Sequence, residues 1–301
     1  MPHARLAGIE LGGTKTLVLL AEDDRIVQRV RIATTHPAET LAAANAQLLA
    51  WNEEAPIDAI GIASFGPIQL SRHAPDFGHM LPTPKPGWAG ADIAGDLTRQ
   101  LDCPMAIDTD VNGAALAEHR WGAGRDLDCF WYITIGTGLG GGLLANGQAV
   151  HGAMHPEIGH IHVRRVPGDT FPGACPFHGD CIEGLVSGPA LAARFGTSPE
   201  LVPDEDPRWD HVAADLAQMA STLFLTTAAQ RILLGGTVAT SRASLLPKVR
   251  ATLLRDLAGY LPFLTPESVD ERLCLAGLGD NAGPMGAVAL AMAAQRDPRG
   301  V

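Results

Sequence analysis

The sequence predicts an α/β protein that is internally duplicated and folds into two domains. A strand, glycine turn and strand pattern occurs twice, at 6–20 (LAGIELGGTKTLVLL) and at 129–144 (CFWYITIGTGLGGGLL). Two apolar runs joined by a short glycine-bearing turn are typical of a β-hairpin. Helix and strand patterns alternate after each hairpin. A chain of 301 residues with 46% hydrophobic residues is also long and apolar enough to bury two cores.

The elements between the hairpins follow from local composition and periodicity. Short buried strands are expected at 57–64, 105–108, 231–234 and 273–276. Helices are expected at 39–51, 93–101, 110–119, 184–195, 209–227 and 247–261. The proline- and glycine-rich region 71–88 should be a long loop.

Glycine and charge in EHRWGAGRD, just before the second hairpin, suggest the domain boundary. We therefore expect an N-terminal domain at 1–120, joined by a C-terminal helix at 284–296. A second domain at 121–283 would carry the cysteine-rich loop described below.

Charge and composition exclude several classes of partner. The 33 acidic and 22 basic residues give a formal charge of −11, which opposes binding to nucleic acid or to an anionic membrane. There is no signal sequence and no apolar run of the ~20 residues that span a bilayer. Five cysteines, an odd number spread over a long chain, favour the reducing cytoplasm over a disulfide scaffold.

The two glycine turns are candidate phosphate sites, because backbone N–H groups can approach phosphate oxygens where no Cβ intervenes. One such turn alone would indicate only a tight hairpin. The second turn has five glycines in the seven residues 136–142, and packing gives no evident reason for so many. The pair favours phosphate binding, through Gly12, Gly13, Thr14 and Lys15 in the first turn and Gly136, Thr137, Gly138 and Gly140 in the second.

Asp110 follows a short strand and begins a helix, in the segment Asp108-Thr109-Asp110-Val111-Asn112. One interpretation is that Asp110 only caps the helix. The other is a carboxylate at the end of a strand that accepts the proton of a sugar hydroxyl as it attacks phosphorus. Both can hold at once.

A cysteine- and histidine-rich loop predicts a metal centre. Cys175, His178 and Cys181 form a Cys-x-x-His-x-x-Cys pattern, and His160 or His162 could supply a fourth ligand. Buried cysteines beside surface histidines are the alternative. Because the loop shows no apolar periodicity, the spacing favours a structural zinc site.

Other polar and glycine positions suggest ligand contacts. Glu157 and Glu183 flank the cysteine-rich loop and could accept hydrogen bonds from sugar hydroxyls, although an acid is also favoured where a helix begins at Glu183. Gly235-Gly236 and the segment 277–283 follow short strands and could admit a nucleotide.

Taken together, these motifs resemble the ROK family (repressor, open reading frame, kinase), and within it the bacterial fructokinases. The resemblance runs from Gly8 to about Ala291. It rests on GIELGGTK, ITIGTGLGGG, HPEIGH, CPFHGDCIEG, LLGGTV and GLGDNAGPMGA, and the fructokinase branch is indicated by SFGPI, TPKPGW and DTDVNGAALAE. It implies a duplicated actin-like (ribonuclease H-like) ATPase fold of two domains with an interdomain cleft. It also implies ATP, Mg²⁺ and a homodimer.

The resemblance also implies roles for individual residues. Asp110 matches the catalytic base, which contacts the sugar together with Gly66, Pro67, Glu157, His160 and Glu183. The zinc ligands would be His160, Cys175, His178 and Cys181. Further nucleotide contacts would come from Gly188, Pro189, Gly235, Gly236 and Gly279.

Three positions depart from the pattern of many relatives. Glu10 stands in place of Asp, which would alter how magnesium or its water is held. Thr109 stands in place of Asn, which removes one contact to a glucose-type sugar. The zinc loop has a histidine where many relatives have a third cysteine.

The function expected is ATP-dependent phosphorylation of a hexose, foremost D-fructose to fructose 6-phosphate. A glucokinase or mannokinase is the alternative, and a non-catalytic sugar sensor is disfavoured by Asp110. A transcriptional repressor is also disfavoured. Its helix-turn-helix would precede a first strand that already begins by Leu6, and the net charge is wrong for DNA.

Overall fold

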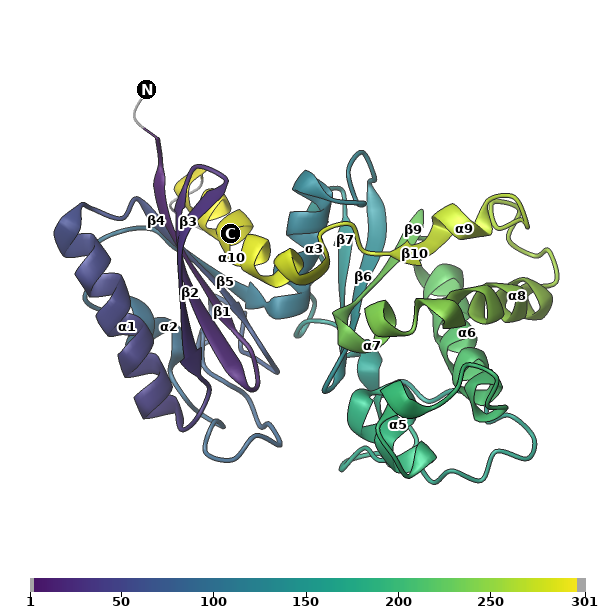
Figure 1. Cartoon of the computed structure of the whole chain (residues 1–301). Coiled ribbons are helices and arrows are strands. Elements are labelled where there is room, and N and C mark those ends of the chain that lie inside the picture. Colours follow the sequence, from purple (N-terminus) through teal and green to yellow (C-terminus); the bar gives the residue numbers. More distant parts are fainter. Residues whose placement is uncertain (1–2, 297–301) are drawn as a thin grey trace. The chain divides into compact units, whose positions relative to one another are not determined.

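The computed structural model describes residues 3–296, which form two compact α/β units. The first unit comprises residues 3–122, 148–156 and 280–296, and the second comprises 123–147 and 157–279. The first unit contains one five-stranded sheet, and the second contains four strands of another (Figure 1). Among the residues described, no helix is both long enough and apolar enough to cross a bilayer.

The sheet of the first unit has the strand order β3-β2-β1-β4-β5. The pairs β1–β2 and β2–β3 are antiparallel, whereas β1–β4 and β4–β5 are parallel. The predicted first hairpin is therefore confirmed, and a third strand extends it. The strands are β1 (Arg5–Leu11), β2 (Lys15–Glu22), β3 (Arg25–Ala33), β4 (Ala59–Ser64) and β5 (Met105–Thr109).

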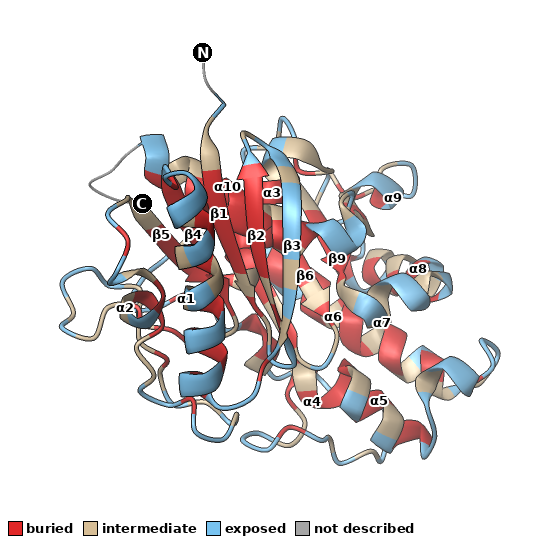
Figure 2. Ribbon diagram, turned by 60° about the vertical axis from the view of Figure 1, so that its left-hand side comes forward, coloured by how far each residue is buried: buried red, intermediate tan, exposed pale blue. Residues whose placement is uncertain are grey.

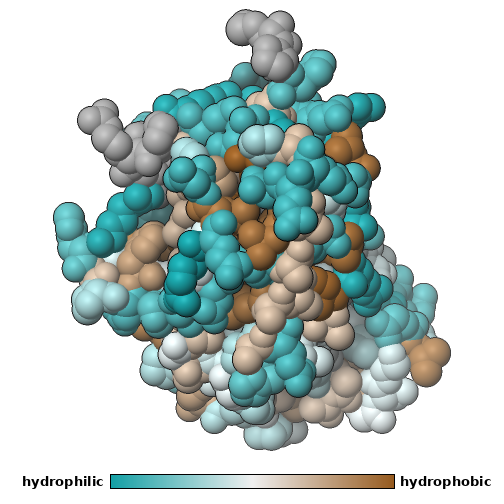
Figure 3. All heavy atoms as spheres, turned by 90° about the vertical axis from the view of Figure 1, so that its left-hand side faces the viewer, coloured by the Kyte–Doolittle hydropathy of each residue, from teal (hydrophilic) through white to brown (hydrophobic). Residues whose placement is uncertain are grey.

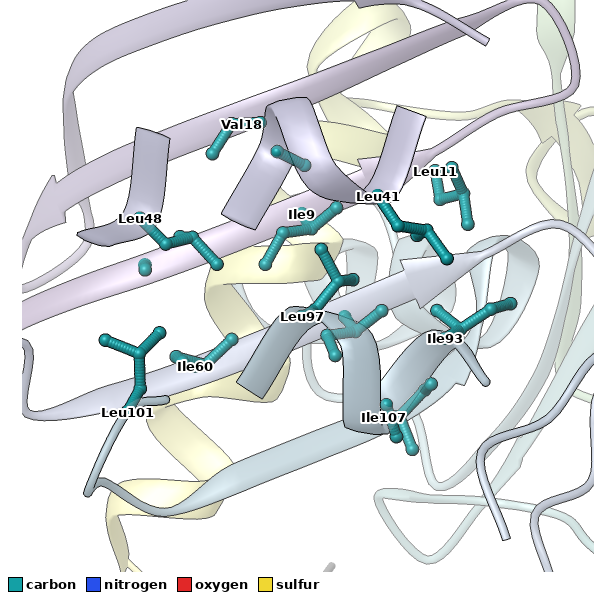
Figure 4. Close-up of a cluster of buried hydrophobic side chains, with 14 of the residues drawn as sticks. Ile9, Leu11, Val18, Leu41, Leu48, Ile60, Ile93, Leu97, Leu101 and Ile107 are labelled. Carbon is teal, nitrogen blue, oxygen red and sulfur yellow. The ribbon is translucent and has the colours of Figure 1, made fainter. Parts of the chain in front are cut away.

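Helices cover both faces of this sheet, so its central strands are apolar on both sides. Side chains alternate along β1: Ile9 packs into the cluster formed with two helices, and Leu6 packs into a separate cluster with the last helix. The first cluster is shown in Figure 4, and the burial of β1 and β2 beside an exposed edge strand β3 is visible in Figure 2. The helices are α1 (Pro37–Glu54) and α2 (Ile93–Thr98) on one face, and α3 (Asp110–Trp121) and α10 (Ala282–Arg296) on the other.

Helix α10 lies directly on the backbone of β4. A Cβ added to Gly61 would lie 2.0 Å from the carbonyl oxygen of Ala287 and 2.3 Å from the nitrogen of Ala291. The contact with α3 is similar, since a Cβ on Gly286 would lie 2.5 Å from the carbonyl carbon of Gly113. This close packing explains why the last helix of the chain belongs to the first unit.

The second unit repeats the topology of the first. Its sheet has the order β10-β9-β6-β7-β8, with a central antiparallel hairpin (β6–β7) and two parallel strands beyond β6. This equivalence confirms the duplication predicted from the two hairpins. The strands of this unit are β6 (Cys129–Ile135), β7 (Leu139–Ala145), β9 (Arg231–Gly235) and β10 (Leu273–Leu275), and the two-residue strand β8 (Gln148–Ala149) falls within the segment 148–156. The helices are α4 (Ile182–Val186), α5 (Gly188–Phe195), α6 (Arg208–Thr227), α7 (Gly236–Ser241), α8 (Leu246–Leu257) and α9 (Val269–Arg272).

Most of the predicted elements are confirmed to within a few residues, but the single helix expected at 184–195 is wrong. The chain forms α4 and α5 instead, separated by Ser187 in an extended conformation. In one continuous helix Pro189 would lack the N–H that bonds to the carbonyl oxygen four residues earlier, and its ring would clash with that oxygen, whereas the first turn of a new helix tolerates it. The Ser187 hydroxyl then caps the new helix by accepting a hydrogen bond from the N–H of Ala190.

One helix end and one additional strand also differ from the expectation. The helix predicted at 247–261 ends at Leu257, because Ala258 adopts a left-handed conformation with a φ of 50°. Strand β3 was not predicted. Its arginine-rich sequence reads as polar, which suits an exposed edge strand that must not pair with another chain. Hydrophilic side chains likewise cover much of the face of this unit that carries α1, with hydrophobic ones between them (Figure 3).

We predict that Gly61→Ala destabilises the first unit, because the added methyl group would overlap the backbone of α10. The expected loss is about 3 kcal/mol, at the upper end of the usual range for an overpacked core. A loss of that size lowers the melting temperature by roughly 6–12 °C in a domain of this length. Gly152→Ala is the matched control, since a Cβ there would approach no atom closer than 3.9 Å. Equal melting temperatures for the two variants would contradict the packing of α10 on β4.

Candidate active site

The turn of the first hairpin presents backbone N–H groups while its carbonyl oxygens are engaged. Thr34 donates its hydroxyl to the Gly12 carbonyl oxygen at 2.8 Å and its N–H to the Thr14 carbonyl oxygen at 3.1 Å. The Gly12 N–H bonds to the Lys15 carbonyl oxygen at 3.0 Å. Within the described chain, no group accepts a hydrogen bond from the N–H of Gly13 or Thr14. Such a turn can bind an anion.

Gly13 is not required by protein packing. A Cβ added there would meet no atom within 4 Å, and its φ is not in the left-handed region. At Gly12, by contrast, a Cβ would lie 2.9 Å from the carbonyl oxygen of Lys15. The close approach of a ligand would explain a glycine at Gly13, and this supports the predicted phosphate contact.

Asp110 is the first residue of α3, where the chain leaves β5. Thr109, not Asp110, caps the helix, because its hydroxyl accepts a hydrogen bond from the Asn112 N–H at 3.1 Å. The Asp110 carboxylate is half-buried and accepts a hydrogen bond from the N–H of Val111 at 2.9 Å. The interpretation of Asp110 as the helix cap is therefore wrong, and its role as a general base stays a prediction.

Asp108, Asn112 and His151 form a polar cluster at the start of α3 that was not predicted. Buried Asp108 accepts a hydrogen bond from Asn112 Nδ2 at 2.8 Å and lies 3.0 Å from His151 Nε2. The hydrogen bond with Asp108 raises the pKa of His151. These contacts fix the end of β5 and the first turn of α3, and hence the backbone that carries Asp110. Asp108 occurs in a segment that the sequence singled out, but His151 does not, and the two residues are far apart in the sequence.

The predicted sugar-contacting turn at Gly66 and Pro67 is supported by His155. The His155 Nε2 accepts a hydrogen bond from the Ile68 N–H at 3.2 Å, and the ring lies 3.4 Å from where a Cβ of Gly66 would be. Burial lowers the pKa of His155, which favours the neutral ring that can accept this bond. The Pro67 carbonyl oxygen in turn accepts a hydrogen bond from the Leu81 N–H at 2.8 Å.

Glu10 offers an oxygen ligand near the first turn. Its Oε2 is buried and has no hydrogen-bond partner among the described residues. Burial raises the pKa of Glu10, and the positive charge of Lys15 opposes that shift. The carboxylate lies against the start of α10, since a Cβ on Gly283 would be 2.2 Å from Glu10 Oε1. A buried carboxylate oxygen without a donor fits a magnesium ion or a water molecule bound to it.

Packing explains part of the glycine content of the second turn, contrary to the expectation from sequence. A Cβ on Gly141 would lie 2.8 Å from the side chain of Ile158. One on Gly138 would lie 2.8 Å from Glu183 Oε2. Gly140 lies within β7. These contacts give Gly138 and Gly141 structural reasons that do not involve a ligand.

Gly136 borders a pocket of about 350 Å³ within the second unit. The Gly188 N–H donates to the Gly136 carbonyl oxygen at 2.7 Å, which joins the start of α5 to the turn. A Cβ on Gly136 would approach only Thr237 Oγ1, at 3.7 Å. Four of the predicted nucleotide contacts therefore meet in one pocket. Its lining includes Gly136, Thr137, Gly188, Pro189, Thr237 and Arg242.

The remaining predicted nucleotide glycines have backbone roles. A Cβ on Gly235 would lie 2.6 Å from the hydroxyl of Tyr132. Gly236 has a φ of 83° and lies against the backbone of Ile135. Gly279 has a φ of 53° in the left-handed region. These conformations explain the residue type, and contact with a nucleotide stays a prediction.

The pKa of Glu157, one of the predicted sugar-binding carboxylates, is raised by its surroundings. Burial, together with the charge of Glu183, raises the pKa of Glu157 to about 7. Glu183 is held by the backbone next to the turn of the second hairpin, because its Oε2 accepts a hydrogen bond from the Leu139 N–H at 3.0 Å. Near neutral pH Glu157 can therefore exist as acid or carboxylate, able to donate to or accept from a sugar hydroxyl.

Four side chains of the cysteine-rich loop converge, and their ligand atoms all lie within 4.8 Å of one another. The His160 Nδ1 is 3.5 Å from Cys181 Sγ and 3.9 Å from Cys175 Sγ, and Cys175 Sγ is 3.8 Å from His178 Nδ1. A tetrahedral site with Zn–S of ~2.3 Å and Zn–N of ~2.0 Å has S···N edges of roughly 3.6 Å. The cluster therefore has the donor set and the dimensions of a zinc site.

His162, the other candidate for the fourth ligand, lies outside this cluster. Its side chain is 62% exposed, and its Nδ1 is 3.6 Å from Asp180 Oδ1. Of the two histidines that the sequence left open, the structure places His160 with the cysteines.

Comparison with known proteins relates this geometry to a family. The model of the ROK family matches residues 6–294. A fructokinase from Pediococcus pentosaceus is 38% identical over 293 residues, which cover 97% of this chain and 99% of that protein. A fructokinase from Zymomonas mobilis is 40% identical over 296 residues, covering 95% and 96% of the two chains.

A solved structure supports the same relationship. The ROK family glucokinase from Streptomyces griseus, in complex with glucose and AMPPNP, superposes with a TM-score of 0.75 at 25% identity and covers 96% of this chain and 100% of that one. This similarity and the repeated sheet topology confirm the predicted duplicated, actin-like α/β fold. The chain therefore belongs to the ROK family.

Proposed function

We propose that the protein transfers the γ-phosphoryl group of ATP to the 6-hydroxyl of D-fructose, forming fructose 6-phosphate and ADP. The main structural support is in the first unit. It combines a turn whose Gly13 and Thr14 N–H groups lack protein acceptors with a carboxylate, Asp110, that does not serve as a helix cap. The similarity to two fructokinases over nearly the whole chain supports fructose as the acceptor.

Asp110 is the proposed general base. Its carboxylate takes the proton of the 6-hydroxyl while the hydroxyl oxygen bonds to the γ-phosphorus. The bond from the γ-phosphorus to the bridging oxygen breaks, and ADP leaves with that oxygen. The cluster of Asp108, Asn112 and His151 keeps the backbone of Asp110 in place during this step.

In this proposal the sugar is held by carboxylates, by one turn and by one histidine. Glu157 and Glu183 bind its hydroxyls, and with a pKa raised to about 7 Glu157 can donate or accept such a hydrogen bond. Further contacts come from Gly66, Pro67 and His160.

The nucleotide is bound by backbone donors and by the pocket beside the second turn, whose volume lies in the range of small-molecule sites. A magnesium ion, when bound, neutralises charge on the phosphates. Glu10 would hold this ion or one of its water molecules, since its Oε2 is buried without a donor. The nucleotide contacts proposed are Gly12, Gly13, Thr14, Lys15, Gly136, Thr137, Gly138, Gly140, Gly188, Pro189, Gly235, Gly236 and Gly279.

We also propose a structural zinc ion bound by the four converging ligands. It would fix the loop at 160–181, next in sequence to Glu157 and Glu183. None of the five cysteines, all of which lie in the described part of the chain, forms a disulfide, which fits the reducing cytoplasm. Assembly as a homodimer is proposed from the family resemblance alone.

A glucokinase or mannokinase is the alternative function. In both, the same polar groups would bind a different arrangement of hydroxyls. A coupled assay of ADP release with fructose, mannose, glucose and N-acetylglucosamine tests this directly, and we expect the highest kcat/KM for fructose. A higher kcat/KM for another hexose would make that hexose the substrate in place of fructose. No ADP release with any of the sugars would favour a non-catalytic sugar sensor.

We predict that Asp110→Asn lowers kcat by ~10²–10⁴, because the amide cannot accept the proton of the hydroxyl. Its melting temperature should stay close to that of the parent, since Thr109 supplies the helix cap. Turnover is measured by fructose-dependent ADP release. Asp102→Asn, an exposed carboxylate just before the same strand, is the control. Near-parental turnover in Asp110→Asn would remove this residue from the role of base.

We predict about one zinc ion per chain by elemental analysis of the purified protein. Cys181→Ala and His160→Ala should lose the metal, because each removes one of four tetrahedral ligands. Cys103→Ala and His162→Ala are matched controls outside the cluster and should retain it. A metal-free parent protein, with Cys181→Ala equally stable and active, would show that the site is not a zinc centre.

A further inference from the structure

Lys85 reaches the turn of the first hairpin from a loop far along the chain. Its Nζ donates a hydrogen bond to the Gly13 carbonyl oxygen at 2.6 Å and lies 3.5 Å from the Thr34 carbonyl oxygen. With the contacts of Thr34, this occupies the carbonyl oxygens of Gly12, Gly13 and Thr14. The backbone groups of this turn that have no partner in the described chain are therefore N–H donors, at Gly13 and Thr14.

The loop that carries Lys85 is firmly anchored. The fully buried Trp88 donates its indole N–H to the Thr35 carbonyl oxygen at 2.9 Å and packs edge-on against Phe65, with ring centroids 5.1 Å apart. The N–H of Trp88 also bonds to the carbonyl oxygen of Lys85 at 3.3 Å. The ammonium group is thus held at the turn by the fold of its own loop, at little cost in side-chain entropy when a ligand binds.

The charge around this ammonium is unusual for the molecule. The chain has three lysines, Lys15, Lys85 and Lys248, and the first two are both at this turn. No carboxylate in the described part of the chain forms an ion pair with Lys85, whereas Lys248 pairs with Asp210 at 2.6 Å. In a protein with a net charge of −11, two lysines beside outward N–H groups create a local site for a polyanion.

We propose that Lys85 is a further catalytic residue, whose ammonium group donates a hydrogen bond to the transferring γ-phosphoryl group at the first turn. An ammonium has three N–H donors, and two are accounted for by carbonyl oxygens, so one remains for a phosphate oxygen. Lys85 neutralises the charge of the phosphoryl group as it passes to the sugar, and it exchanges no proton in the step. This inference rests on the proposed kinase function.

The kinetic test compares Lys85→Met, Lys85→Arg and the surface control Lys248→Met. Loss of one charged donor to the transferring group should lower kcat roughly 10²–10³-fold in Lys85→Met. KM for fructose should change by no more than about twofold, since the lost hydrogen bond is to the phosphoryl group and not to the sugar. Lys85→Arg should recover part of kcat because it keeps the charge, and Lys248→Met should match the parent. An unchanged kcat in Lys85→Met would contradict the catalytic role. A lower melting temperature with a raised KM and no loss of kcat would show that Lys85 only stabilises its loop.

A second measurement uses the parent protein and does not depend on a variant that folds. Limited acetylation with an N-hydroxysuccinimide ester, read by mass spectrometry, reports on all three lysines with and without magnesium and AMPPNP. We expect several-fold protection of Lys15 and Lys85, with no change at Lys248. Protection of Lys15 alone would overturn the role of Lys85 and leave the kinase function standing. No protection at either lysine, with no fructose-dependent ADP release, would overturn both.

Discussion

The proposed chemistry depends on the outward N–H groups of Gly13 and Thr14. Thr34 and Lys85 bind the carbonyl oxygens of this turn, so the backbone groups that it offers to a ligand are donors. Backbone donors fixed in this way need no reorganisation when negative charge develops, which is the most effective form of electrostatic catalysis. They also allow an acidic protein to bind a triphosphate, because the local field at the turn opposes the net charge. A lysine at the same turn would extend that field toward the group being transferred.

The two units use one topology for different purposes. In the first, the parallel strand β5 leads into α3 and delivers Asp110, and the Asp108–Asn112–His151 cluster holds the junction. In the second, the equivalent hairpin borders a pocket, and the loop after it gathers four zinc-type ligands. The difference arises from the loops, since the sheets have the same strand order. Helix α10 completes the first unit through backbone contacts that only glycines such as Gly61 permit.

The sequence was sufficient where a feature is local. Both hairpins, the strand before Asp110 and the zinc-type spacing can be read from a few adjacent residues. It was insufficient where two segments meet, since the pairing of Asp108 with His151 joins residues 43 positions apart. Residue type alone also left the wrong options open: Thr109 caps the helix that one interpretation assigned to Asp110, and Gly141 makes room for Ile158. In each case the deciding fact is a contact that local patterns do not encode.

The most direct measurement is a crystal structure of the protein with fructose, magnesium and AMPPNP. The account predicts oxygens of the terminal phosphate within about 3.2 Å of the backbone nitrogens of Gly13 and Thr14, the distance of an ordinary hydrogen bond. A triphosphate bound with no oxygen near either nitrogen would contradict it, because the donors on which the whole assignment depends would then have no part in the reaction.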